Sequence, residues 1–370
     1  MKKKILILTS YVTGHGHKSI TNALEEELKK RDDIEFKSVE AFEFGGKMGV
    51  RIGKLYAPII RTSEDMWKFI FKLSSKDPNS VRRTVRQLMK NKFYKLIDDY
   101  KPDLILSVHP AFTSAVIDLL HRKRLKIPFA ILVADLISIS TLWVDTRADL
   151  FIAPTIQASI FAQKLGMREK KIRLLNLPVR KEITEAAQKI TEIDVEGLKN
   201  KENVDFLVMS GGEGSGDMAS IISKLLKVEN SRVSVIAGRN SKLKEVLELK
   251  FSPYKDRVTI YGFVKDMEIL LTTHDIGIVR GSPNVLMECI NCTLPVVITG
   301  TLPGQEEGNV DFILANKLGV LWHKKHSFSM VINSLLKNDK EKLIEIKQNQ
   351  LKFRDLGAAT KIVDELVKLL

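Results

Sequence analysis

The feature that most constrains the fold of this chain is the alternation of short apolar runs with longer stretches of helical periodicity. This alternation is typical of βαβ units, in which helices join parallel strands and cover both faces of a sheet. Ten apolar runs predict strands: Ile5–Thr9, Ile34–Val39, Leu104–Val108, Phe129–Val133, Leu150–Ala153, Phe206–Met209, Val233–Ala237, Val258–Tyr261, Ile276–Val279 and Val296–Ile298.

The strands form two groups, which predict two Rossmann-like, doubly wound α/β domains. We expect an N-terminal domain at residues 1–180 and a C-terminal domain at 204–370, joined by a charged, weakly apolar linker at 181–203. A chain of 370 residues fits two domains of roughly 150–200 residues each. Residues 358–370 carry one apolar helical stripe, which closes the second domain or packs back on the first. Ligands are expected at the carboxyl ends of the strands.

The charge and the cysteine content limit the partners and the compartment. The net charge of +14 favours an anionic partner, such as a phosphate-bearing ligand, nucleic acid or an anionic membrane. Cys289 and Cys292, the two cysteines, lack the further ligands of a zinc site, so we expect buried thiols and a reducing compartment. The apolar run Ile5–Leu8 is shorter than a signal peptide core of about 7–15 residues or a membrane-spanning helix of about 20. These features predict a cytoplasmic protein, soluble or peripheral to a membrane.

Most of the excess positive charge lies between Lys47 and Lys95, where 13 Lys or Arg face three Asp or Glu. Basic amphipathic segments that carry Trp and Phe lie in membrane interfaces. The alternative is a set of helices with solvated charge and a buried aromatic face. Nucleic acid would suit the charge, but no recognition module accompanies it. The residues predicted to contact an anionic membrane are Trp67, Phe69, Arg82, Arg83 and Arg86.

A loop with two glycines and two histidines follows the first predicted strand. In Thr13–Ser19, Gly14 and Gly16 permit a tight turn before a helix, whose N-terminus attracts negative charge. The neighbouring His15 and His17 suit proton transfer near neutral pH. A plain turn with solvated histidines is the alternative. The glycine spacing does not match the dinucleotide-binding fingerprint.

The second half contains three further loops that suit a nucleotide. Ser210–Asp217 is rich in glycine, and Gly238-Arg239-Asn240 after the next strand lacks the acidic residue that an NAD ribose needs, so NAD is not expected. Arg280–Asn284 forms a Gly/Pro turn before a short helix that carries Glu288. A helix N-terminus suits a diphosphate, and a carboxylate suits a ribose diol. In Thr301–Asn309, Gln, Glu and Asn side chains suit sugar hydroxyls, although a polar surface loop would look the same.

Taken together, these motifs give the chain a specific resemblance. The matching pieces are Thr13–His17, Ser107–Pro110, Ala134-Asp135, Gly211–Gly216, Gly238–Asn240 and, most specifically, Pro303–Asn309. In this order they resemble the monogalactosyldiacylglycerol synthase and processive diacylglycerol glucosyltransferase family. These are inverting, metal-independent glycosyltransferases of the GT-B fold, in which two Rossmann-like domains face a cleft. Two segments depart from the family pattern, namely Arg280–Val285 and Thr141-Leu142-Trp143.

The resemblance implies a hexosyltransferase that moves a hexose from a UDP-sugar to a lipid acceptor at the cytoplasmic face of a membrane. The acceptor that the resemblance favours is diacylglycerol. It implies no cofactor, no metal and no nucleic acid partner. Three alternatives stay open: a UDP-sugar 2-epimerase of the same fold, a glycosyltransferase that uses a polyprenyl-linked acceptor, and a non-enzymatic basic protein that binds membrane or nucleic acid. The identity of the sugar and the number of sugars added also stay open.

The resemblance assigns roles to individual residues. His17 takes the place of the catalytic histidine, with Asp135 as a second candidate for the base. Glu288 would hold the uridine ribose, and Gln305 and Glu306 the donor sugar. The implied donor site comprises Ser210, Gly211, Gly212, Gly214, Gly238, Arg239, Phe263, Val264, Ser282, Asn284, Glu288, Gln305, Glu306 and Asn309. The implied acceptor side adds Gly14, Gly16 and His109 to the membrane residues named above.

Overall fold

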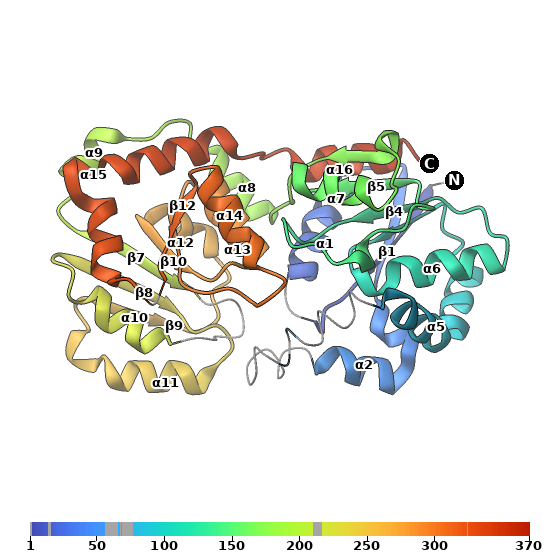
Figure 1. Cartoon of the computed structure of the whole chain (residues 1–370), viewed down its shortest axis with the longest axis horizontal. Coiled ribbons are helices and arrows are strands. Elements are labelled where there is room, and N and C mark those ends of the chain that lie inside the picture. The colour runs from blue at the N-terminus through green and yellow to red at the C-terminus, as the bar shows by residue number, and fades with distance from the viewer. Residues whose placement is uncertain are drawn as a thin grey trace. The chain divides into compact units, whose positions relative to one another are not determined.

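The fold is described from a computed structural model of residues 2–13, 16–55, 66, 68, 77–209, 217–323 and 325–370. The chain divides into two compact units. The first unit comprises Met1–Arg180, Leu302–Gly308 and Gly357–Leu370, and the second comprises Lys181–Thr301 and Asn309–Leu356. Each unit is a parallel sheet flanked by helices, as Figure 1 shows.

The sheet of the first unit has six parallel strands in the order β2-β1-β3-β4-β5-β6. The strands are β1 (Lys3–Thr9), β2 (Ile34–Glu40), β3 (Leu104–Ser107), β4 (Phe129–Leu132), β5 (Leu150–Ala153) and β6 (Ile172–Leu174). Ile5–Leu8 of β1 and all of β3 are buried, as expected for central strands that helices cover on both faces. The strand order reverses between β1 and β3, and this switch point is where a doubly wound sheet binds its ligand.

Local sequence signals start the helices of the first unit. Asp77 caps α5 and His109 caps α6, and each cap precedes a proline at the first helical position. Thr155 caps α7. The helices are α1 (Gly16–Leu28), α2 (Gly46–Lys54), α5 (Pro78–Tyr100), α6 (Pro110–Arg122), α7 (Ile156–Lys164) and α16 (Ala358–Val367), with short 3₁₀ turns η1 (Ala41–Gly45), η2 (Thr141–Trp143) and η3 (Glu169–Lys171).

The second unit repeats the architecture, with strand order β12-β11-β10-β7-β8-β9 and a switch point between β7 and β10. The strands are β7 (Val204–Met209), β8 (Ser231–Ile236), β9 (Val258–Tyr261), β10 (Ile276–Val279), β11 (Val296–Ile298) and β12 (Gly319–Leu321). The helices are α8 (Lys181–Gln188), α9 (Val195–Asn200), α10 (Met218–Leu225), α11 (Ser241–Lys250), α12 (Met267–Thr273), α13 (Pro283–Asn291), α14 (Glu307–Ala315) and α15 (Phe328–Phe353), with the 3₁₀ turn η4 (Ser252–Tyr254). Its core packs apolar residues of β7, β8 and β10 against α10 and α15.

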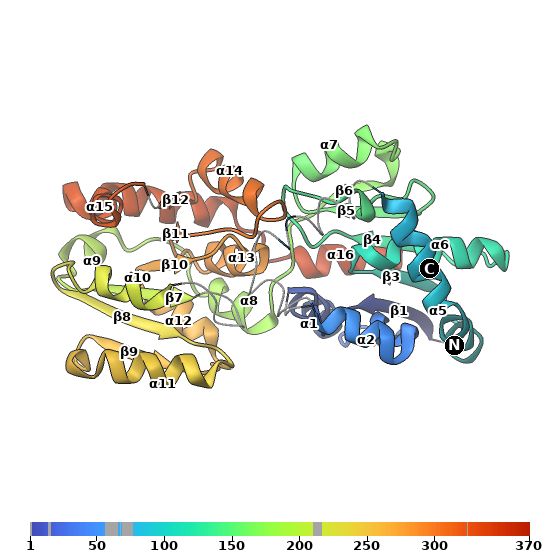
Figure 2. The same ribbon diagram turned by 60° about the horizontal axis from the view of Figure 1, so that its bottom comes forward.

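The predicted fold class, two Rossmann-like domains, is confirmed, and all ten predicted strands are present. Two segments, 181–203 and Leu302–Gly308, differ from the predicted boundaries, and the place of the last helix, which the sequence leaves open, is now defined. Leu302–Gly308 groups with the first unit. Residues 181–203 contain α8 and α9 and group with the second unit, because Ile183 and Ala187 are buried there. The C-terminal helix α16 groups with the first unit and lies beside α1 (Figure 2). Within the described residues, no helix is long and apolar enough to cross a membrane.

Candidate active site

The loop between β1 and α1 is held by side chains at the ends of two strands. The buried carboxylate of Glu40, at the end of β2, accepts hydrogen bonds from the backbone N–H groups of Tyr11 and Val12, the latter at 3.2 Å. The hydroxyl of Thr21 contacts the Thr9 hydroxyl at 2.7 Å and donates to the carbonyl of His17 at 2.8 Å. His17 therefore stands in a fixed first turn of α1, at the carboxyl end of the sheet.

His109 lies beside His17 at the switch point of the first unit. The two imidazole ring centroids are 4.6 Å apart. The Nδ1 atom of His109 accepts the backbone N–H of Ala111 at 3.2 Å, which places the proton of the neutral ring on Nε2. Burial lowers the pKa of His109 well below its ordinary value, and the charge of His17 adds to this effect. His109 is therefore a neutral hydrogen-bond donor at physiological pH.

Asp135 follows β4 and is buried with two side-chain donors. Its Oδ2 atom accepts the indole N–H of Trp143 at 2.7 Å, and its Oδ1 atom accepts the amide N–H of Gln305 at 2.9 Å. Burial raises the pKa of Asp135, while these two hydrogen bonds and the charge of His17 oppose the rise. Both carboxylate oxygens are thus held by N–H groups, which fixes the orientation of the carboxyl group.

His17 has the properties of a neutral base beside this carboxylate. Burial lowers the pKa of His17, and the charge of Asp135 and a hydrogen bond with the Val108 backbone only partly offset the decrease. Its Nδ1 atom is buried and has no hydrogen-bond partner in the described part of the chain. A neutral imidazole near a fixed carboxyl group can accept a proton, since the carboxylate charge stabilises the imidazolium that forms.

The segment Leu302–Gly308 belongs to the first unit and packs closely on the loop after β4. The N–H of Gly308 donates to the Ser138 hydroxyl at 3.0 Å, and a Cβ atom on Gly308 would lie 2.6 Å from Ile137. Gln305, predicted to contact the donor sugar, contacts Asp135 instead in this structure, and the Glu306 carboxylate accepts the Leu302 N–H at 2.7 Å. Contact of these two side chains with a sugar stays a prediction.

In the second unit, the loop between β10 and α13 lies at the switch point. The N–H of Gly281 donates to the Gly300 carbonyl at 2.9 Å. Ser282 is the N-cap of α13, but its side chain makes no capping hydrogen bond in the described structure, so the first turn can receive an anion. Asn309 is fully buried and donates to the Gly281 carbonyl at 2.7 Å, so it supports the loop from behind. Asn284 and Glu288 lie half-buried on α13.

Two further residues of the predicted donor site contact each other where β8 and β9 end. The guanidinium of Arg239 lies 4.6 Å from the ring centroid of Phe263, which is 56% exposed. Gly238 precedes Arg239 with a φ of +64°, a conformation that favours glycine. Val264 is half-buried beside Phe263. An exposed aromatic ring backed by a cation is a surface on which a nucleotide base can stack.

Several residues that the sequence singled out either form structural contacts or lie outside the described part of the chain. Arg82 and Arg86 form ion pairs with the buried Asp118, whereas Arg83 is exposed. Cys289 and Cys292 are buried free thiols. Among the residues with described positions, no three His, Cys, Asp or Glu side chains gather as a metal site. Lying outside the described residues are Ser210, Gly211, Gly212, Gly214, Gly14, Trp67 and Phe69.

The sequence reasoning did not assign Trp143, Glu40 or Thr21 to the site. Trp143 was noticed only as part of a segment that departs from the family pattern. A buried tryptophan usually finds an acceptor for its N–H, so an isolated Trp eight residues after a candidate base was an available signal. Glu40 and Thr21 have no comparable signal, because their roles depend on the packing of β1 against β2 and α1.

Comparison with known proteins identifies the class of the molecule. Residues 17–179 match the family model for monogalactosyldiacylglycerol (MGDG) synthase, and residues 197–338 match the model for group 1 glycosyl transferases. MurG of Acinetobacter baumannii has a similar fold, with a TM-score of 0.65 at 12% identity over 99% of both chains. The UDP co-structure of S. aureus MnaA gives a TM-score of 0.60 at 16% identity over 100% of this chain and 98% of that one. The protein is a glycosyltransferase with the GT-B fold.

Curated relatives extend the likeness over nearly the whole chain. MGDG synthase 1 of Arabidopsis thaliana is 26% identical over 99% of this chain and 71% of its own length. MGDG synthase 3 of the same plant is 25% identical over 98% of this chain and 81% of its own length. The chain is thus similar to MGDG synthases over nearly its whole length, and it is a hexosyltransferase.

Proposed function

We propose that this enzyme transfers a hexose from a UDP-sugar to the hydroxyl of diacylglycerol or a related membrane lipid, with inversion at the sugar carbon and without a metal ion. The observation that carries the proposal is the cluster of the buried Asp135 and Trp143 with the half-buried His17 and Gln305. The curated relatives are named monogalactosyldiacylglycerol synthases, and this name supports the acceptor class.

In the proposed reaction, His17 accepts the proton of the acceptor hydroxyl as its oxygen bonds to the anomeric carbon. The bond from that carbon to the diphosphate oxygen breaks, and its electron pair leaves with UDP. Attack on the face opposite the leaving group inverts the configuration. The carboxylate of Asp135, oriented by Trp143 and Gln305, stabilises the imidazolium of His17.

The second unit offers a matching set of groups for the donor. The N-terminus of α13 suits the diphosphate, because its dipole and its free N–H groups favour negative charge. Glu288, one turn further on, suits the ribose hydroxyls, and the Arg239–Phe263 pair suits the uracil. These groups would also stabilise the charge that develops on UDP as it leaves. We place the enzyme peripherally at the cytoplasmic face of a membrane, a proposal supported by its net charge of +14.

The first test is a product assay with labelled UDP-glucose, UDP-galactose, UDP-glucuronate and UDP-N-acetylglucosamine, with and without diacylglycerol vesicles. A labelled glycolipid that forms only with vesicles is the expected result. An epimerised free sugar nucleotide, formed without lipid, would contradict the proposal. Product that forms only with a polyprenyl phosphate acceptor would show that this lipid, and not diacylglycerol, is the acceptor.

The second test replaces the proposed base. His17→Ala should lower kcat by roughly a hundredfold, the usual size of a general-base contribution, and leave UDP affinity unchanged. The control is His121→Ala, since His121 is exposed on α6 and lies outside the cluster. Near-normal turnover of His17→Ala would remove His17 from the mechanism.

A further inference from the structure

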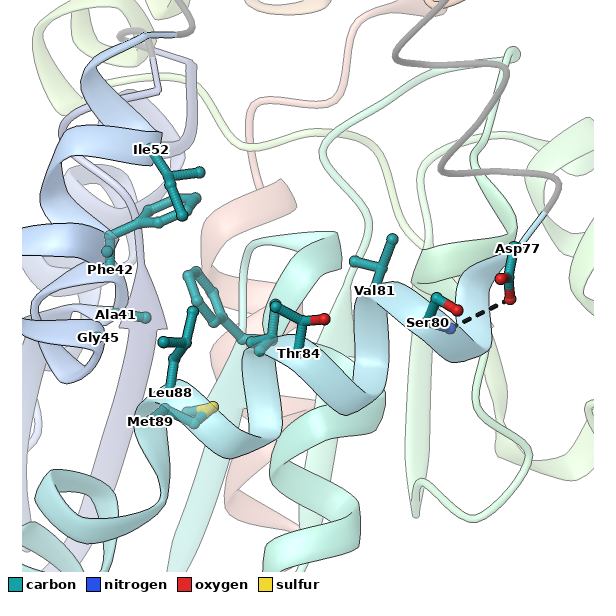
Figure 3. A pocket seen from close by; sticks show the side chains of 13 residues that line it. Ala41, Phe42, Gly45, Ile52, Asp77, Ser80, Val81, Thr84, Leu88 and Met89 are labelled. Carbon is teal, nitrogen blue, oxygen red and sulfur yellow. Dashed lines mark hydrogen bonds between the residues drawn. The ribbon is translucent and has the colours of Figure 1, made fainter.

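The first unit contains an apolar cavity that the reaction scheme does not use. It has a volume of about 520 Å³, within the size range of small-molecule sites. One wall comes from η1 and α2, with Phe42 and Ile52, and the opposite wall from α5, with Leu88 and Met89 (Figure 3). Its lining is almost wholly apolar, so a ligand that fills it must be a hydrocarbon.

The polar residues at the rim do not change this conclusion. Asp77 and Ser80, at the start of α5, are joined to each other, since the Asp77 carboxylate accepts the Ser80 N–H at 3.1 Å (Figure 3). Thr84 is exposed on the next turn. Among the described residues that line the cavity, Asp77 has the only charged side chain. The cavity therefore has one polar end and an apolar interior. This distribution matches a lipid, in which a polar headgroup is attached to an apolar chain.

The helix α2 gives the cavity an apolar and basic mouth. Gly49 and Gly53 face inward, where added Cβ atoms would lie 2.2 Å from the Phe42 carbonyl oxygen and 2.4 Å from Val12. This close packing turns the opposite face of α2 outward. Ile52 lines the cavity and is 46% exposed. The other outward side chains are Met48, Leu55, Lys47, Arg51 and Lys54, a mixture that suits an anionic lipid surface.

The inner wall of the cavity is continuous with the active site. Phe42 and Phe112 line the cavity, with ring centroids 4.9 Å apart. Both contact the imidazole of His109, at 5.4 and 5.1 Å between centroids. His109 in turn contacts His17 at 4.6 Å. Two layers of rings thus separate the hydrocarbon space from the proposed base.

We propose that this cavity holds one acyl chain of the diacylglycerol acceptor, taken from the bilayer past α2, and thereby selects acceptors by chain length. The identity of the acceptor rests on the proposed function. The binding of a hydrocarbon chain does not, because it follows from the cavity itself.

A binding experiment without any sugar donor tests the cavity directly. The fluorescence of dansyl-undecanoic acid, bound to the full chain, should fall when dioctanoylglycerol displaces it. Thr84→Trp should weaken the binding of both molecules by about tenfold or more, because the indole excludes several methylenes and each buried methylene contributes about a fourfold gain in affinity. The control is Gln87→Trp, which adds the same side chain at an exposed position of α5 outside the lining. Equal affinities for the wild type and Thr84→Trp would overturn the proposal.

A second variant and further measurements make the outcome of this experiment decisive. If Thr84→Trp does not fold, as judged by its melting curve, Leu88→Ala enlarges the cavity and should shift binding toward longer chains. Displacement by octanoate but not by dioctanoylglycerol would assign the cavity to free fatty acids and contradict the acceptor role. In the transferase assay, the wild type should show a KM that depends on chain length from dioctanoyl- to dipalmitoylglycerol, and Leu88→Ala should change that dependence, whereas Gln87→Trp should alter neither the dependence nor kcat. An unaltered chain-length dependence in Leu88→Ala would count against the proposal. A wild type that binds the hydrocarbon chain but has no transferase activity would refute only the proposed function.

Discussion

At the scale of single residues, burial acts in opposite directions on the two groups of the proposed base pair. It lowers the pKa of His17 and raises that of Asp135, and each charge opposes the shift of the other. The imidazole is therefore neutral when the acceptor binds, and the carboxyl group is oriented by Trp143 and Gln305. A base of this kind is ready to take a proton before any rearrangement.

The pH dependence of the reaction follows from the lowered pKa of His17. The base works in its neutral form, so kcat/KM should fall as the pH falls through this pKa, which lies below the ordinary value of 6.5. Asp135→Asn removes the charge that raises the pKa of His17, so it should move this acid limb to lower pH and also reduce kcat. Steady-state rates between about pH 5 and pH 8 test both effects. An acid limb at or above 6.5, or one that does not move in Asp135→Asn, would contradict the assignment.

The sequence predicts His17 and Asp135 as candidate bases because a histidine after a glycine turn and an acid after a buried strand are local patterns, and their catalytic role stays a prediction. The sequence did not indicate the hydrogen-bond partners of Asp135. Gln305 lies 170 residues further along the chain, and only the fold brings it to Asp135. For the same reason, nothing local indicated that Phe42 and Met89 line a cavity, since their spacing is that of ordinary core residues.

At the scale of elements, the buried Asp118 of α6 joins α5 to the loop after η2. Its carboxylate forms ion pairs with Arg82, Arg86 and Arg147, which outweigh the effect of burial and hold its pKa well below its usual range. Asp118→Ala would remove the anion that pairs with Arg82 and Arg86, and would leave Arg147 with Asp145 alone. It should lower the free energy of unfolding by about 3–5 kcal/mol in urea titrations near neutral pH.

A surface pair between the same two helices gives the control. Asp98 of α5 and Lys123 at the end of α6 are 3.5 Å apart and largely exposed, so Asp98→Ala should change stability by less than about 1 kcal/mol. Equal effects of the two variants would show that Asp118 is not a structural centre.

Arg83→Ser tests the membrane prediction, by vesicle flotation at two salt concentrations, without disturbing the Asp118 network.

The close packing of Gly308 predicts a second effect at this scale. Gly308→Ala places a Cβ against Ile137 and Ser138 and should push the segment Leu302–Gly308 away, so that Gln305 no longer reaches Asp135. We expect kcat to fall by roughly ten- to hundredfold. Gln305→Ala should reproduce the fall without a loss of melting temperature, and unchanged turnover in both variants would exclude this segment from catalysis. Gly300→Ala, whose Cβ meets nothing within 4 Å, is the control for stability.

The strands themselves were predictable because most of them are continuous apolar runs buried on both faces. The two missed strands, β6 and β12, are three-residue edge strands at the ends of the sheets. Each has a partly exposed residue, and β6 has the pattern Ile-Arg-Leu with only its first residue buried. A run this short and this polar carries no distinctive periodicity, so its pairing depends on the neighbouring strand rather than on its own sequence.

At the scale of the whole molecule, the helix α16 belongs to the first unit although it follows the second in sequence. Ile362, Val363 and Leu366 are buried, and α16 packs on α1. Two ion pairs also join α16 to the first unit: Asp364 pairs with Arg31, which follows α1, and Glu365 pairs with Arg173 of β6. The sequence predicted the apolar stripe of this helix but left open which domain it covers, because a stripe identifies a buried face and not its partner.

Truncation of a buried side chain in α16 should therefore affect one unit only. Ile362→Ala should lower the stability of the first unit by about 2–5 kcal/mol and speed amide hydrogen exchange in α1. Exchange in β7 and β10 of the second unit should not change. Thr360→Ala, at an exposed position of the same helix, should leave both units as they are. Faster exchange in β7 and β10 would mean that α16 stabilises the second unit as well.

The position of α16 also sets the order in which the molecule can mature on the ribosome. The strands of the first unit leave the exit tunnel early, but the helix that carries His17 receives its last packing partner only after all of the second unit has been synthesised. A chain that stops short of residue 357 would contain all of the second unit but an unfinished first unit. Full-length synthesis would then be a condition for the first unit to reach its final stability.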